Sequence, residues 1–91
     1  PVDLYEKAET EAAGTILDAA RAQGEKAGVT CETLHVRDRH PAEGIIEAAG
    51  NKGCDLIVMA SHGRRGIAKI LLGSVASEVL THSRVPILIV K

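Results

Sequence analysis

Residues 54–91, CDLIVMASHGRRGIAKILLGSVASEVLTHSRVPILIVK, contain the pattern that decides the fold. A run at 55–60 that is apolar on both faces leads into a polar loop with glycines, a helical stretch and a second apolar run at 86–90. Strands that are apolar on both faces are typical of a sheet covered by helices on both sides. The stretch therefore predicts two buried strands joined by a loop and a helix.

The helix between these strands is expected to run from Gly73-Ser74 to about His82, with Ser74 as its N-cap. The side chains expected to face the core are Val75, Val79 and Leu80. The helix is expected to end at 84–86, because proline cannot continue it. A short helical turn is expected earlier, at 67–72.

Upstream of this stretch, a second helix is expected to begin with Pro41 in its first turn and to end at the glycines of 50–53. The residues expected on its inner face are Ile45, Ile46, Ala48 and Ala49. Before it, the β-branched and partly polar segment at 29–36 predicts a strand near a sheet edge.

The first segment, about 2–27, is expected to be a helix that Gly24 and Gly28 close. Apolar residues recur in it at steps of three and four, which is typical of an amphipathic helix. The expected inward stripe consists of Leu4, Tyr5, Ala8, Ala12, Ile16 and Ala20. The order helix, strand, helix, strand, helix, strand predicts an α/β fold, an open parallel sheet with flanking helices.

Composition excludes several functional classes. The 91 residues suffice for one domain, and 45% apolar with 25% charged residues is ordinary for a globular protein. Eleven basic and twelve acidic residues, with no Phe or Trp, argue against nucleic-acid binding and an anionic membrane surface. No apolar run approaches the roughly 20 residues of a membrane span. No histidine spacing suggests a metal site.

The two cysteines, Cys31 and Cys54, lie in apolar surroundings without a CxxC motif. Two buried thiols in a reducing compartment are the expected state, rather than a disulfide. We therefore expect a cytoplasmic protein.

The polar loop after Met59 is the candidate site, since ligands of open α/β sheets lie beyond the carboxyl ends of the strands. A helix start such as Gly73-Ser74 favours an anion, above all phosphate. The positive side chains that would assist are Arg64, Arg65 and Lys69. The alternative is that the glycines turn the chain and the serine caps a helix. Neither a Walker A motif nor GxGxxG is present.

Catalysis has weaker support. His62 beside the loop is a conceivable general acid or base, but no carboxylate stands at a spacing that would orient it, and a structural role in the loop is favoured. Ser74 lacks the GxSxG pattern of a nucleophile elbow. A hydrolase using Ser74 or Ser61 with His62 is therefore the least favoured hypothesis, and we expect no enzyme and no catalytic residue.

Residues 54–91 resemble the C-terminal half of the universal stress protein family, and 29–49 resemble its preceding strand and helix, including Pro41-Ala42-Glu43. The first helix fits the second helix of that family more weakly. The resemblance implies an adenine nucleotide alpha hydrolase-like fold. It also implies that the family's first strand, first helix and second strand lie outside this chain, so that 1–91 form a single partial domain, truncated at the N-terminus.

The nucleotide-binding branch of the family has a glycine, two residues, a glycine, nine residues and then Gly-Ser or Gly-Thr. Here Gly63 and Gly73-Ser74 match, while Ala60 replaces the first glycine. The resemblance implies nucleotide-binding residues Met59 and Ala60 near the sugar and phosphates, and a phosphate cradle of Gly63, Gly73, Ser74 and Val75. Arg64 is added to these binding residues because of its charge, the alternative being a solvated side chain.

The implied function is binding of ATP or another adenine nucleotide as a regulatory ligand in the stress response. The base half of the pocket is not within this chain, so we expect weak or no ATP binding by these 91 residues. The alternative is a nucleotide-independent dimerisation or interaction module. In either case the resemblance implies a homodimer through the C-terminal strand, from Pro86 to Val90.

The strand at 29–36 lacks its family neighbours. Three outcomes are open. The segment at 29–36 pairs beside the strand at 55–60, or a second chain takes the place of the absent family strands by exchange. In the third outcome the absent strands exist but are not part of this chain.

Overall fold

The computed structural model describes residues 2–37, 39–61 and 72–91. Its elements are α1 (Val2–Lys26), α2 (Pro41–Asn51), β1 (Ile57–Ala60), α3 (Ser74–His82) and β2 (Ile87–Val90). They fall into an N-terminal unit, Pro1–Arg37, and a C-terminal unit, Asp38–Lys91. The α/β class with a parallel sheet and flanking helices is confirmed.

Helix α1 ends at Lys26 and is closed, as expected, by the glycine two residues later, Gly28. Its φ of 80° places it in the left-handed region that suits glycine. The Val29 N–H donates to the Gly24 carbonyl at 2.8 Å, and the Gly28 N–H donates to the Glu25 carbonyl at 3.0 Å. This pair of bonds is the Schellman arrangement that satisfies the last carbonyls of a helix. Gly24 itself lies inside the last turn of α1 rather than after it.

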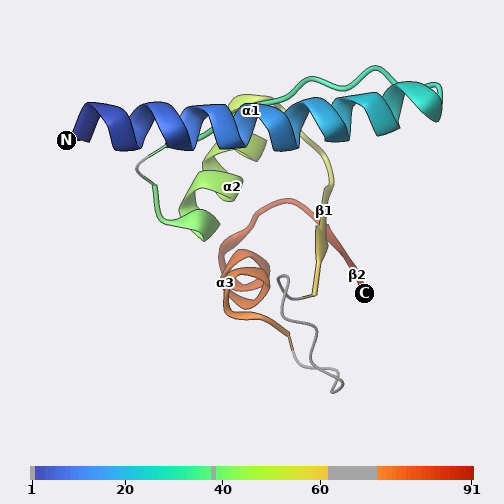
Figure 1. The fold of residues 1–91 in the computed structure, drawn as a ribbon. Helices are drawn as coiled ribbons and strands as arrows, with labels where there is room; N and C mark the ends of the chain where they lie inside the picture. Colours follow the sequence, from blue (N-terminus) through green and yellow to red (C-terminus); the bar gives the residue numbers. More distant parts are fainter. Residues whose placement is uncertain (1, 38, 62–71) are drawn as a thin grey trace. The chain divides into compact units, whose positions relative to one another are not determined.

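The segment at 29–36 is extended but forms no strand in the described part of the chain, so the prediction of a strand there is wrong. It returns along α1 within the N-terminal unit (Figure 1). Arg21 donates to the Thr33 hydroxyl at 2.8 Å, and Arg37 lies 3.5 Å from the Glu6 carboxylate. These side-chain contacts hold the segment against its own helix.

The apolar stripe expected to face inward on α1 is exposed instead. All six predicted residues, Leu4, Tyr5, Ala8, Ala12, Ile16 and Ala20, are exposed. The half-buried positions of the helix are Glu6, Ala13, Gly14, Leu17 and Gly24. The prediction is wrong because the returning segment covers a different face of the helix from the one that periodicity selected.

Helix α2 has the predicted beginning and end. Pro41 stands in its first turn, and Gly53 follows its C-cap with a φ of 65°. The Cys54 N–H donates to the Ala49 carbonyl at 2.9 Å, and the Gly53 N–H donates to the Gly50 carbonyl at 3.2 Å. This is a second Schellman end.

The described sheet has two parallel strands, β1 and β2, in direct register from Ile57 opposite Ile87 to Ala60 opposite Val90. Helix α3 belongs to the crossover between them. Both strands are slightly shorter than expected. The prediction that the segment at 29–36 pairs beside β1 is wrong, because the ladder of the described residues joins β1 to β2 alone.

The core of the C-terminal unit lies on one face of this sheet. Val79 is 0% exposed and packs with Ala42 and Ala49 of α2 and Ile57 of β1, while Ala76 of α3 is also buried. Leu80, expected to face inward, is 52% exposed, because it lies about 100° around the helix from Val79.

The opposite face of the sheet is open in the described residues. Val58 is 56% exposed and Leu88, its partner in register, is 51% exposed. Within the C-terminal unit, helices cover one face of the sheet. The reason is that α2 and α3 both pack on the face of Ile57.

Cys31 is half-buried and Cys54 is exposed, and both thiols are free. The expectation that both cysteines are buried is therefore wrong for Cys54, which lies just after the end of α2. In the described residues no helix has the length and apolar character to cross a membrane, and no three potential metal-binding side chains gather.

Candidate functional site

The carboxyl end of β1 and the start of α3 are hydrogen-bonded to each other. The Gly73 N–H donates to the Ser61 carbonyl at 2.6 Å, and the Ser61 N–H donates to the Val90 carbonyl at 2.7 Å. Ser61 is thus held to the end of β2, and Gly73 is held to Ser61. The start of α3 therefore lies at the carboxyl edge of the sheet, the position where ligands of open α/β sheets bind.

Gly73, not Ser74, is the N-cap of α3, so the prediction of Ser74 as the cap is wrong. Gly73 is extended, with φ −62° and ψ 161°, and its carbonyl accepts from the Ser77 N–H at 2.9 Å. The hydrogen bond to Ser61 holds Gly73 in this extended form, so that Ser74 becomes the first helical residue.

This arrangement leaves the first turn of α3 without a side-chain cap. The N–H groups of Ser74, Val75 and Ala76 precede the first intrahelical donor and have no acceptor within the helix. Together with the positive end of the helix dipole they favour an anion. Ser74 is exposed, so its hydroxyl can reach a ligand as well.

The other predicted residues divide into two groups. Met59 and Val75 pack against the core cluster, so that a ligand would meet their backbone rather than their side chains. Ala60 is exposed and lies at the end of β1. Gly63 and Arg64 lie outside the described residues, as do His62, Arg65 and Lys69.

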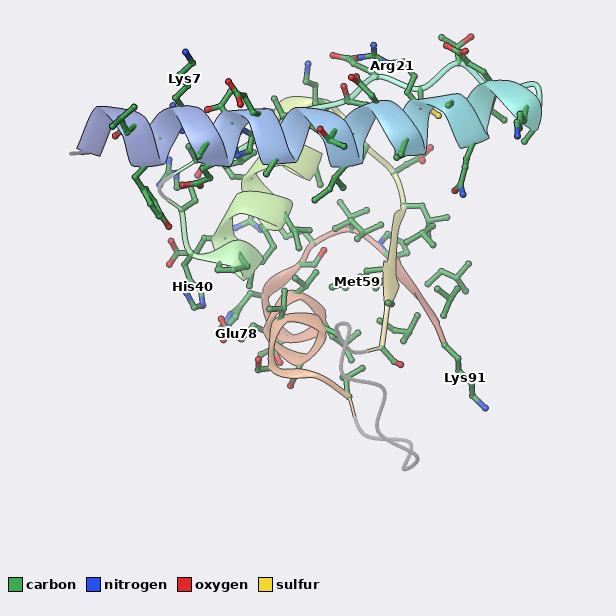
Figure 2. The ribbon with its side chains drawn as sticks, in the orientation of Figure 1. Lys7, Arg21, His40, Met59, Glu78 and Lys91 are labelled. Carbon is green, nitrogen blue, oxygen red and sulfur yellow. The ribbon has the colours of Figure 1, made fainter. Side chains whose placement is uncertain are left out.

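Two ion pairs lie at the start of α2. Arg39, two residues before α2, contacts the carboxylate of Glu47 within that helix at 2.9 Å. The His40 Nε2 lies 2.9 Å from the Glu78 Oε2, which joins the residue before α2 to the middle of α3 (Figure 2). The sequence offered no sign of this second pair, because its members are 38 positions apart and share no motif.

Comparison with known proteins agrees with this architecture. The universal stress protein family matches residues 1–91. The solved structure of MJ0577 from Methanocaldococcus jannaschii covers 98% of this chain with a TM-score of 0.82 and 30% sequence identity. The chain covers 61% of that structure.

Curated relatives carry the same family name. The universal stress protein YxiE of Bacillus subtilis is 38% identical over 76 residues, which are 84% of this chain and 51% of YxiE. The universal stress protein MJ0531 of M. jannaschii is 49% identical over 51 residues, 56% of this chain and 30% of MJ0531. The chain thus spans about half, or less, of the length of these relatives.

The family match extends over both units, and the same fold is found in a solved relative. This chain belongs to the universal stress protein family.

Proposed function

We propose that the chain binds ATP or another adenine nucleotide as a regulatory ligand, with the phosphates at the start of α3. The observation that carries this proposal is the hydrogen bond from Gly73 to Ser61. It brings the end of β1 and the uncapped first turn of α3 together, as phosphate binding by backbone N–H groups requires. The spacing from Gly63 to Gly73-Ser74 supports the same proposal.

The proposed binding residues are Met59, Ala60, Gly63, Arg64, Gly73, Ser74 and Val75. Ala60, which replaces a glycine of the nucleotide-binding branch, is the last residue of β1 and lies in register with Val90. Its backbone is therefore extended, a conformation that alanine adopts without strain. The replacement adds a methyl group beside the site but does not disturb the strand.

The proposed role is regulatory rather than catalytic. Ser61 and Ser74 are the hydroxyl groups of the described part of the site. Neither lies in the GxSxG pattern of a nucleophile elbow. The nucleotide is proposed to regulate the protein by binding to it, and not to serve as the substrate of a reaction.

A second candidate is a homodimer that forms through β2 without a nucleotide. The Ile57 N–H donates to the Pro86 carbonyl, and the Ser61 N–H donates to the Val90 carbonyl. The backbone N–H and C=O groups of the even-numbered residues of β2 therefore point toward β1. The backbone groups of Ile87 and Ile89 therefore point to the other edge of β2. Such an edge is a template for pairing with a second copy.

Nuclear magnetic resonance titration of the chain with ATP, adenosine and inorganic phosphate tests the first candidate. We expect ATP and phosphate to shift the amide signals of Ser74, Val75 and Ala76, and adenosine alone to leave them in place. Shifts confined to other parts of the chain would contradict the proposed site. Sedimentation of the chain without any nucleotide tests the second candidate, for which a dimer is the expected result.

A further inference from the structure

We draw no further inference here: the strongest candidate, the apolar surface patch that Val58 and Leu88 form on the face of the β1–β2 sheet opposite α2 and α3, carries none, because nothing in the structure shows what covers it.

Discussion

The Gly73 N–H donates to the Ser61 carbonyl at 2.6 Å, which joins the end of β1 to the start of α3. Because Gly73 is thereby held extended, the helix begins at Ser74 and its first turn has no side-chain cap. A backbone bond between residues twelve positions apart thus decides which N–H groups are available to a ligand. Because this bond makes Gly73 the N-cap, the Ser74 side chain does not cap the helix and is available to bind a ligand.

Replacement of Ser74 by alanine should weaken phosphate binding without lowering stability. A hydrogen bond to a charged group contributes about 1.5–3 kcal/mol, so a loss of roughly ten-fold or more in affinity is expected. The free energy of unfolding should change by less than about 0.5 kcal/mol, as for surface substitutions in general, since Ser74 is not the cap. Ser77→Ala, also exposed on α3, is the control for both measurements. A large loss of stability in Ser74→Ala, but not in Ser77→Ala, would show that the Ser74 side chain caps α3 and would contradict this prediction.

Replacement of Gly24 by alanine should destabilise the N-terminal unit. A Cβ atom at Gly24 would collide with the Cys31 sulfur, so the Cys31 side chain would have to leave its place, by a change of rotamer or by a shift of the returning segment. Overpacking of this kind costs about 1–3 kcal/mol. Gly14→Ala is the matched control, because a Cβ there meets open space and a helical alanine stabilises by about 0.5–1 kcal/mol over glycine. Urea unfolding followed by circular dichroism measures both. Equal effects of the two variants would show that Cys31 does not pack at Gly24.

Replacement of Val79 by alanine should destabilise the C-terminal unit, and replacement of Leu80 should not. Val79 is fully buried between α2 and β1, so removal of its two methyl groups and the resulting cavity should cost about 1.5–3 kcal/mol. Leu80 lies on the exposed side, and its replacement should cost less than about 0.5 kcal/mol. Thermal and urea unfolding of the two variants provide the comparison. A larger loss for Leu80→Ala would mean that α3 is rotated about its axis.

Replacement of Leu88 by lysine should disfavour a dimer formed through β2. A charged side chain on an edge strand opposes pairing with a second strand. Sedimentation should shift toward monomer or the protein should become insoluble. Val58→Lys is the matched control, because Val58 lies in register with Leu88 on the same open face but on β1, a strand that the proposed dimer does not pair. A soluble dimer that persists in Leu88→Lys would place the interface elsewhere.

The sequence by itself determined where α2 begins, where α1 and α2 end, and the positions of the paired strands. Pro41 at the start of α2, and Gly28 and Gly53 after the helix ends, act through φ preferences and a missing N–H, which depend on neighbouring residues alone. The same local chemistry located the loop after Met59 as the candidate site.

The tertiary structure decided which faces are covered. Periodicity on α1 identified a stripe through Leu4 and Ile16, but the returning segment covers another face, because Cys31 meets Gly24 there. The extended residues at 29–36 have strand composition, yet a strand exists only where a neighbouring backbone accepts its hydrogen bonds. His40 and Glu78 are brought together by the packing of α2 on α3, and no local pattern encodes a contact across 38 positions.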